Sequence, residues 1–564
     1  MDSTDKKFEE RADFIDEQDL LKWTVENDFF NTIQKSIIGR GAKLIVGPRG
    51  TGKTHQLKHA YFECIKNNEK PFALYVTFGS YYRLEPLLFN ASNAINIFHA
   101  WVLSKIILSC YEMLNILKKN NNVKLLYNEH LNEKELRSFI EKAERYKELP
   151  EFDKLIKFLS IQKTIDIIEN LTQKIGRKRA ILILDDAALT LTPDYMIEFF
   201  DIFRSLKTLH ISPKASVYPG TTQYGPRFHI GQDAENILAW LKVDDESYST
   251  FMDQMLERRF VDIQIEKDII ELLKFASFGI PRAFITLMRN YQKDKGKTIQ
   301  QKFNNVINDQ KELLQQEYLS LALKIPQYSS IIRTGLNLFD KIINELTKAN
   351  QSNPDEKQVC VGIMEEPETH RVGRMIKFLI EAGFLYEIGP LHDGPDRMFN
   401  RYMPHFLFLI QNRAFSFTKG FNAKEIILFI NKKTNKRPLR KQIKSFLDEN
   451  QLNNIRLNLP ACSKCGTERL TEGQKFCHNC GNPLIGQSAF EACLKLKIED
   501  LPIPKWQKEA IIKETQIRIV EDILISQGPA SELKKAHGIG KVKSNKIYEI
   551  VNKVYKNIYE EFLA

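Results

Sequence analysis

A glycine-rich segment, "GPRGTGKT", at residues 47–54 limits the possible folds more than any other part of the chain. It matches the pattern G-x-x-x-x-G-K-[ST], follows the apolar run "KLIV" directly and precedes a stretch with helical periodicity. Glycines let the backbone curl round phosphate groups, so that its N–H groups and the helix amino terminus face them. We therefore expect Lys53 to reach the β- and γ-phosphates of ATP and Thr54 to bind Mg²⁺. The glycines of this loop are Gly47, Gly50 and Gly52.

Short apolar runs with strand character alternate with stretches of helical periodicity. The runs lie at residues 43–47, 72–78, 180–184 and 215–219. This alternation predicts an α/β fold, in which helices cover a parallel sheet. Residues 91–177 contain no strand run, and their apolar spacing is helical. We expect them to form a helical insertion before the third strand.

Two adjacent carboxylates, Asp185 and Asp186, follow the third apolar run. The first stands where a carboxylate would hold Mg²⁺ through water. Asp186 is expected to orient the water that attacks ATP. Many P-loop ATPases have a glutamate here, and because aspartate is one methylene shorter, slow hydrolysis is predicted. The alternative interpretation is that Asp186 only caps the strand end.

Further polar residues follow the fourth apolar run. In "GTTQYG", Thr221 or Thr222 is placed to face the γ-phosphate, unless both residues only form a turn. Three arginines follow: Arg258 and Arg259 in "ERRF", and Arg282 in "GIPR".

The order of these parts resembles the AAA+ ATPases. "GIPR", and the helix, strand, turn, strand pattern of residues 371–410, look most like the origin-recognition and replication-initiator clade, over about residues 20–412. The resemblance implies that Arg282 is a lid arginine on the same subunit's nucleotide. It also implies that Arg258 or Arg259 is a finger that reaches a neighbour's γ-phosphate, in a homo-oligomer with ATP between subunits.

A second resemblance stays open. "LDD" with "GIP" is also similar to the STAND switch ATPases, in which nucleotide exchange controls assembly. No repeat array follows that would serve as a STAND sensor, and the lid arginine is present. The initiator-like interpretation therefore leads.

Four cysteines form two C-x-x-C-G knuckles, Cys462 with Cys465 and Cys477 with Cys480, and eleven residues lie between Cys465 and Cys477. Each knuckle presents two thiolates from one turn, so together they predict a closed, structural Zn²⁺ site. The arrangement resembles a zinc ribbon, which would touch nucleic acid, contact a protein or only hold a small domain together. The other four cysteines are isolated, and a metal site in a reducing compartment fits better than a disulfide framework.

The tail at residues 529–554 resembles a helix-hairpin-helix motif, in which Leu533, Ser544 and Ile547 pack two helices around the hairpin "HGIGK". The resemblance implies that the hairpin amides meet a DNA phosphate. An ordinary glycine-linked helical hairpin is the alternative. The basic residues beside the hairpin are Lys541, Lys543 and Lys546.

The net charge of +11 belongs to the carboxy-terminal part of the chain. Residues 413–460 carry 11 Lys+Arg against 3 Asp+Glu, and residues 461–564 carry 16 against 13, which leaves the first 412 residues neutral. We expect backbone contacts with DNA through residues 413–564 and through residues 329–412, whose helix, strand, turn, strand order suggests a winged helix. A solvated lysine-rich surface and an RNA-binding module are the alternatives.

The expected architecture is an α/β P-loop AAA+ core at 1–265 with its insertion at 91–177, a helical lid at 266–328, a winged helix at 329–412, a basic linker or small helical domain at 413–460, a four-cysteine zinc ribbon at 461–486 and a helix-hairpin-helix domain at 487–564.

The expected function is a slow ATPase, stimulated by DNA or a partner, that uses ATP, Mg²⁺ and Zn²⁺. It would recruit or regulate a separate effector protein in replication initiation, mobile-element control or anti-phage defence. The alternative is a STAND-type switch with little turnover that senses a protein trigger. Because no eighteen apolar residues run unbroken, we expect a soluble, cytoplasmic protein without a membrane partner.

Overall fold

The computed structural model describes residues 7–79, 84, 87, 93–118, 131–145, 149–187, 193–260, 263–364, 370–394, 397–417 and 420–453, with shorter stretches and single residues between 455 and 551. The longest of these later stretches are 476–482, 497–501, 503–524, 532–540 and 542–547.

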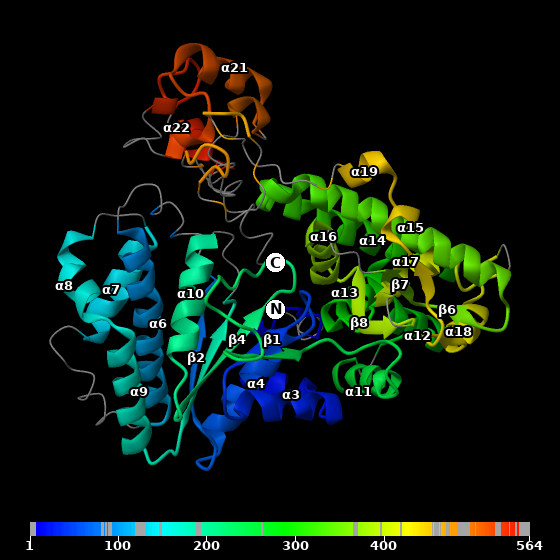
Figure 1. The fold of residues 1–564 in the computed structure, drawn as a ribbon, viewed down its shortest axis with the longest axis horizontal. Coiled ribbons are helices and arrows are strands. Elements are labelled where there is room, and N and C mark those ends of the chain that lie inside the picture. Colours follow the sequence, from blue (N-terminus) through cyan, green and yellow to red (C-terminus); the bar gives the residue numbers. More distant parts are fainter. Residues whose placement is uncertain are drawn as a thin grey trace.

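A five-stranded parallel sheet forms the centre of the amino-terminal half, with strand order β2-β3-β4-β1-β5 (Figure 1). The strands are β1 (Lys43–Val46), β2 (Phe72–Thr77), β3 (Ala180–Asp185), β4 (Ile211–Val217) and β5 (Glu235–Leu238). The predicted α/β fold class is therefore confirmed. The sequence did not indicate β5, because this edge strand is mostly exposed and lacks an apolar run.

Strand β4 begins at Ile211, four residues before the apolar run that predicted it. The sequence hid this start because Lys214, although buried, interrupts the apolar pattern. The ammonium of Lys214 donates to the carbonyls of Gly39 (2.9 Å) and Gly41 (2.5 Å), just beyond the end of helix α3. Burial, and then the nearby Lys43, lower the pKa of Lys214 to about 7. These two bonds compensate for removing the ammonium from water.

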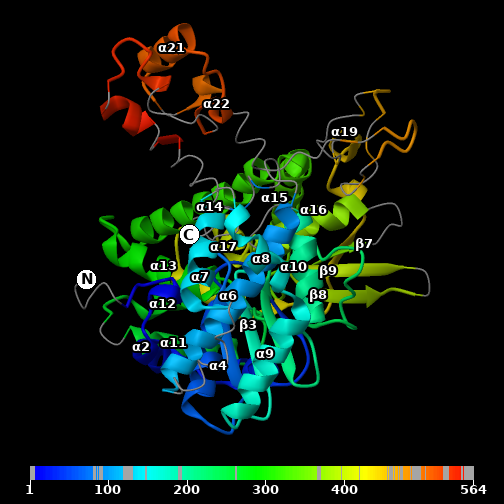
Figure 2. The same ribbon diagram turned by 90° about the vertical axis from the view of Figure 1, so that its left-hand side faces the viewer.

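Helices cover both faces of the sheet (Figures 1 and 2). Helix α4 packs on β2 and β3 from one side, and the connections from β2 to β3 and from β3 to β4 lie on the other, as right-handed crossovers require. The first elements are η1 (Ala12–Phe14), α2 (Glu17–Trp23), α3 (Asp28–Ile38) and α4 (Lys53–Lys66). The elements between β2 and β4 are α6 (Ala94–Ile116), α7 (Glu133–Ala143), η4 (Pro150–Phe152), α8 (Asp153–Phe158), α9 (Ile161–Lys174) and α10 (Pro193–Ser205).

Among the described residues, helix α6 is long and apolar enough to cross a membrane. However, 78% of its most apolar window is buried inside the protein. It packs against β2, α7 and α10, as the core helix of a folded domain does.

A helical unit follows the sheet, formed by α11 (Tyr248–Arg259), α12 (Lys267–Ala276), α13 (Pro281–Lys293) and α14 (Ile299–Lys324). Helix α13 begins with Pro281 at its first turn, where a missing N–H costs nothing. Gly279 precedes it with φ +73°, and a Cβ there would lie 2.1 Å from the carbonyl oxygen of Leu241. Glycine at this position therefore lets the chain turn tightly against the sheet domain.

The next unit has the helix, strand, helix, hairpin order of a winged helix. It comprises η5 (Pro326–Tyr328), α15 (Ser329–Ser352), β6 (Lys357–Gln358), β7 (Val361–Met364), α16 (His370–Glu381), β8 (Leu385–His392), β9 (Met398–Pro404) and α17 (Phe406–Gln411). Strands β8 and β9 pair antiparallel, and their hairpin projects from the body in Figure 2.

The basic segment after residue 412 differs from the linker or small helical domain that was expected. It forms α18 (Ala423–Asn431), β10 (Lys433–Thr434), β11 (Leu439–Lys441), η6 (Ile443–Ser445) and α19 (Glu449–Asn453). Strand β10 pairs with β6, and β11 pairs with β7 in the sheet β11-β7-β9-β8. The segment thus extends the sheet that β7, β8 and β9 form, a long-range pairing that local sequence does not reveal.

Two hydrophobic cores occur in the described residues. One runs continuously from Phe8 to Ile455, through the sheet domain, the helical unit and the unit from η5 to α17. The other lies between Ile498 and Val551 and includes Leu533 and Ile547. The tail also contains η7 (Ile498–Asp500), α21 (Lys505–Glu514) and α22 (Val520–Leu524).

Candidate functional site

The glycine-rich loop joins β1 to α4 and borders a cavity of about 170 Å³. Gly50 and Gly52 have φ of +80° and +89°, which the curled loop requires. The cavity is lined by the residues from Arg49 to Gln56, which include Lys53 and Thr54, together with Asp186, Ser216, Tyr218 and Arg282. Gly47 and Asp185 lie at the strand ends behind this wall.

The ammonium of Lys53 is held inside the loop. It donates to the carbonyls of Gly47 (2.7 Å) and Pro48 (2.9 Å) and lies 4.2 Å from the ring centroid of Tyr218. Burial, and then the charge of Arg49, lower the pKa of Lys53 to about 7. A phosphate group would restore the charged form, so Lys53 is poised to bind an anion.

An apolar wall closes the other end of the cavity. Its side chains come from the segment before β1 and from α11 and α13, and they have the size and character to hold a planar base. They are Ile15, Trp23, Val25, Phe29, Phe30, Phe251, Met255 and Ile285. The sequence did not indicate this wall, because its members are dispersed over 270 residues and look like ordinary core positions.

The Asp185 carboxylate is buried at the end of β3, with a relative exposure of 1%. It accepts hydrogen bonds from the hydroxyls of Tyr75 and Ser216, each at 2.7 Å. Burial, and then Asp185, raise the pKa of Tyr75 well above its ordinary value, so Tyr75 remains a donor. Sequence reasoning missed both hydroxyls, although each stands as a polar residue within an apolar strand run. Together they fix the orientation of Asp185.

Asp186 lines the cavity and has φ +54°, a left-handed conformation that is uncommon outside glycine. Its N–H donates to the Asp185 Oδ1 (3.0 Å) and to the Ser216 Oγ (2.9 Å), and its carboxylate accepts from the Thr77 hydroxyl at 3.4 Å. Burial, then Asp185 and Asp13, raise the pKa of Asp186 to about 7. A carboxylate with this pKa can take up a proton near neutral pH.

Arg282 reaches the loop from the start of α13. Its backbone N–H donates to the Gly50 carbonyl at 3.2 Å, and its side chain lines the cavity. A Cβ on Gly50 would lie 2.7 Å from the Arg282 Cβ, so the glycine permits this close approach. The structure thus brings the predicted lid arginine to the loop.

Thr221 and Thr222 lie beside the cavity, but neither is among the described residues that line it. The hydroxyl of Thr221 donates to Glu381 of α16 at 2.9 Å. The hydroxyl of Thr222 accepts from the backbone N–H of Tyr218 at 3.0 Å. In this conformation both threonines hold the loop after β4 in place.

Arg258 and Arg259 contact the amino-terminal segment of their own chain. Arg258 donates to the carbonyl of Thr24, and Arg259 donates to the carbonyls of Lys7 (2.6 Å) and Glu9. The Arg259 guanidinium also lies 4.5 Å from the ring centroid of Trp23, and burial lowers its pKa to about 10. Arg259 lines the cavity from within the same chain.

The amino-terminal segment that these arginines hold is part of the cavity wall, from Glu10 to Asp13. Glu10 pairs with Arg289 at 2.6 Å, and Asp13 pairs with Lys58 at 3.2 Å. The segment is charged and carries no motif, so the sequence did not indicate this position.

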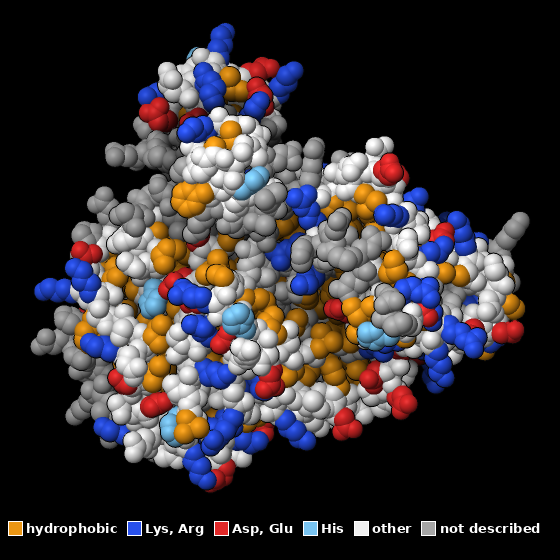
Figure 3. Space-filling model, in the orientation of Figure 1, with side chains coloured by type: hydrophobic (Ala, Val, Ile, Leu, Met, Phe, Trp, Pro, Cys, Tyr) orange, Lys and Arg blue, Asp and Glu red, His pale blue; other side chains and the backbone are white. Residues whose placement is uncertain are grey.

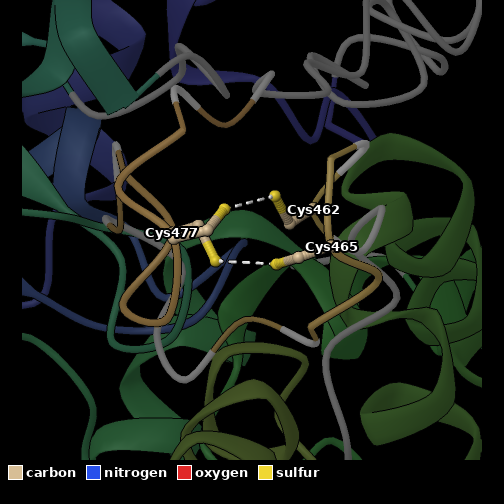
Figure 4. Close-up of side chains that lie close together, drawn as sticks. Cys462, Cys465 and Cys477 are labelled. Atoms are coloured by element: carbon tan, nitrogen blue, oxygen red, sulfur yellow. Dashed lines mark hydrogen bonds between the residues drawn. The ribbon is translucent and has the colours of Figure 1, made fainter.

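The four predicted cysteines converge at a separate site, with their sulfur atoms directed toward one another (Figure 4). All four Sγ atoms lie within 4.8 Å of each other. In each knuckle, a glycine with positive φ donates to the carbonyl of the first cysteine: Gly466 to Cys462 (2.8 Å) and Gly481 to Cys477 (2.9 Å). Four thiolates from two such turns fit a tetrahedral Zn²⁺. The cluster is completed by Cys465 and Cys480.

The tail hairpin is described in part. Ser544 is fully buried, and Gly538 has φ +78°. Lys543 donates to the Gly538 carbonyl at 3.0 Å and lies 4.7 Å from the ring centroid of Trp506. Lys546 lies on the following helix, and Lys541 is outside the described residues.

A glycine-rich loop on a parallel sheet, with two adjacent aspartates at the end of β3 and a lid arginine, defines a P-loop ATPase fold. Residues 8–215 match the family described as ORC-CDC6-like. This part of the chain is therefore similar to AAA+ ATPases of the origin-recognition and initiator type, and the predicted resemblance is confirmed.

Solved structures with a similar fold are more distant. The Walker-type ATPase PABY2304 of Pyrococcus abyssi has 13% identity and a TM-score of 0.37, covering 72% of this chain and 99% of its own. The Aeropyrum pernix Orc1 protein in complex with DNA has 11% identity and a TM-score of 0.28, covering 70% and 91%. AMPPCP-bound DnaA from Aquifex aeolicus has 13% identity and a TM-score of 0.29, covering 58% and 83%. No curated protein matches. These similarities are weak.

Proposed function

We propose that this protein is an ATP-dependent, DNA-binding ATPase whose nucleotide state sets its oligomerisation on DNA and its recruitment of a separate effector protein. The observation that carries the proposal is the convergence of Lys53, Asp186 and Arg282 on one cavity, beside a winged helix. The effector would act in replication initiation, mobile-element control or anti-phage defence.

In this proposal each residue has a defined role. Lys53 and Arg282 bind the phosphates, and the apolar wall holds the adenine. Thr54 and Asp185 would hold Mg²⁺, which neutralises phosphate charge when bound. Asp186 orients the attacking water and accepts its proton. The single methylene of Asp186 leaves it further from that water than a glutamate would be, so slow turnover is expected.

We assign the DNA contact to the exposed basic face of residues 431–444, a segment that includes strands β10 and β11. Lys432, Lys436, Arg437 and Lys444 are exposed on it. Arg440 pairs with Asp393 at the tip of the hairpin (3.0 Å), which places this segment beside the wing. In Figure 3, Lys and Arg side chains are frequent at the right-hand end, over β6 and α18, and on the tail unit at the top, interspersed with acidic ones. Such a surface contacts phosphates without reading sequence.

The cysteine cluster is proposed to hold a structural Zn²⁺, because four sulfur donors leave no ligand position open. None of the seven cysteines that the structure describes forms a disulfide. This supports a reducing compartment, the cytoplasm.

The first test is ATP hydrolysis by purified protein with and without duplex DNA. We expect a slow rate that DNA increases, and loss of this rate in Lys53→Ala and Asp186→Ala. DNA binding is then measured against salt concentration for Lys436→Glu, with Lys134→Glu on α7 as the control for added negative charge. Removal of one phosphate-binding side chain should reduce the slope of log K against log[salt] by about 0.9. Wild-type affinity that is independent of salt would contradict the proposal.

A STAND-type switch is the second candidate. It is favoured by the burial of α16, whose described positions from 371 to 381 are exposed only at Gly373 and Lys377. A closed winged helix suits a protein that waits for a trigger. This candidate predicts ADP that copurifies with the protein and no response of hydrolysis to DNA.

A further inference from the structure

The carboxylate of Glu381, the last residue of helix α16, binds the loop that follows β4 in the ATPase sheet. Its Oε2 accepts hydrogen bonds from the backbone N–H groups of Gly220 (2.8 Å) and Thr221 (2.6 Å). Its Oε1 accepts from the Thr221 hydroxyl at 2.9 Å. Glu381 has a relative exposure of 4%, so a buried charge is held by three donors from one loop.

The loop lies directly against α16. A Cβ on Gly220 would stand 2.9 Å from the Glu381 Oε2 and 2.9 Å from the carbonyl oxygen of Lys377. The second of these atoms is backbone and cannot move without shifting the helix. Glycine at position 220 therefore permits the contact, and any side chain there would push the loop and the helix apart.

The same loop touches the phosphate-binding machinery. Tyr218 begins it, and its ring lies under the ammonium of Lys53 (4.2 Å) and the guanidinium of Arg49 (5.4 Å). Tyr218 is tied to the loop by the bond from its N–H to the Thr222 hydroxyl. A continuous set of contacts thus connects the P-loop lysine to the end of α16 through the segment 218–222.

Helix α16 precedes the hairpin, which is the place of the DNA-reading helix in a winged helix. Most of its surface is covered in this structure, including Val372, Met375 and Phe378. Glu381 fixes the carboxyl end of this helix on the ATPase core. The position of the helix is therefore coupled to the loop after β4.

We propose that Glu381 and the loop at Gly220 and Thr221 form a latch that ATP opens, so that nucleotide binding controls the freedom of the winged helix to engage DNA. This inference rests on the proposed nucleotide-dependent DNA binding. The Thr221 hydroxyl has one proton, which it donates to Glu381 here, so this proton is not available to a nucleotide while the latch is closed. The buried Glu381 carboxylate also repels a nucleotide triphosphate placed at Lys53. Closed latch and bound ATP therefore oppose each other.

Coupling of this kind is reciprocal, so opening the latch must favour ATP and DNA together. Two variants open it by different means. Glu381→Gln keeps the size of the side chain and removes the negative charge. Gly220→Ala keeps every charge and separates loop from helix by steric conflict. Glu387→Gln, the same substitution at an exposed position of β8, is the control.

The first readout is ATP affinity, measured with a fluorescent ATP analogue and no DNA. Both latch variants should bind ATP more tightly than the wild type, by about fivefold or more, a typical lower limit for coupling between sites. Glu387→Gln should not change it. If Glu381→Gln tightens binding and Gly220→Ala does not, the effect is charge removal alone, and the latch is refuted.

The second readout is hydrogen exchange of the peptide that spans residues 218–222. Its amides at Gly220 and Thr221 should exchange slowly in the free wild type and faster in both variants. Addition of AMP-PNP should accelerate exchange in the wild type, and unchanged or slower exchange would overturn the proposal.

The third readout is the ratio of DNA affinities with and without AMP-PNP. It should exceed one in the wild type and approach one in both variants, because their latch is already open. A ratio that the variants retain refutes the latch. A wild type that binds no DNA at all refutes the proposed function instead, and the first two readouts then still decide whether the latch exists.

Discussion

The pH dependence of ATP hydrolysis tests the cavity most directly, because two of its groups titrate near neutral pH. In its proposed role Asp186 must be deprotonated to accept a proton from water, and its pKa is raised to about 7. Lys53 must be protonated to bind phosphate, and its pKa is lowered to about 7. As pH rises, the active form of Asp186 is gained while the active form of Lys53 is lost. The plot of kcat/KM against pH, which reports the free enzyme, should therefore be bell-shaped.

The width of the bell follows from the two pKa values. For independent groups that both titrate at about 7, the fraction with Asp186 charged and Lys53 charged is about one quarter at pH 7 and falls about eightfold at pH 5.5 and at pH 8.5. Ordinary values for aspartate and lysine would instead give a flat profile over this range. The structure thus predicts a narrow optimum where unperturbed groups would show none.

The assay is the initial rate at ATP concentrations well below KM, at constant ionic strength, with circular dichroism at each pH to check folding. Lys53→Arg is the diagnostic variant, since a guanidinium stays charged throughout. It should keep the acid limb and lose the alkaline limb, at a lower overall rate. A flat wild-type profile between pH 5.5 and 8.5 would refute the assigned pKa shifts. An alkaline limb that persists in Lys53→Arg would refute the assignment to Lys53.

Three further predictions follow from the site. Tyr75→Phe removes a hydroxyl that donates to Asp185. The Mg²⁺ concentration for half-maximal hydrolysis should therefore rise about tenfold, the effect of one hydrogen bond to a charged group. An unchanged Mg²⁺ requirement would show that Asp185 does not need this hydrogen bond. Arg259→Ala releases the amino-terminal segment from the cavity wall and should raise KM for ATP; mixing it with Lys53→Ala subunits should not restore hydrolysis, whereas restoration would establish Arg259 as a finger in trans. Purified protein should contain one Zn²⁺ per chain by metal analysis, and Cys465→Ser should lose it. The KM for ATP should not change in this variant, because the cysteine cluster shares no residue with the cavity. A coupled loss of ATP binding would contradict this separation.

Most of the phosphate-binding site could be predicted from the sequence, because its signals are local. The curl of the loop needs glycines at fixed spacing, and a strand must deliver Asp185 to the same sheet edge. The cysteine knuckles are equally local, since each turn positions its own pair of thiolates. The four apolar runs predicted four of the five strands of the central sheet for the same reason.

The features that sequence reasoning missed depend on contacts between distant segments. Strand β5 is exposed at the sheet edge and has no apolar pattern, and the strands of the basic segment form only because β6 and β7 are there to pair with them. Tyr75 and Ser216 become supports for Asp185 only through the register of β2, β3 and β4.

Short motifs in the sequence are enough to establish a P-loop ATPase module and a four-cysteine cluster, because local backbone geometry sets both sites. The connections between the ATPase core and the segments on either side of it arise only when the chain folds. Folding buries Glu381 against the loop after β4 and places Arg259 on its own amino-terminal segment, and no local pattern encodes either contact. A buried carboxylate needs hydrogen-bond donors, and here they come from two residues that are 160 and 161 positions away in the sequence.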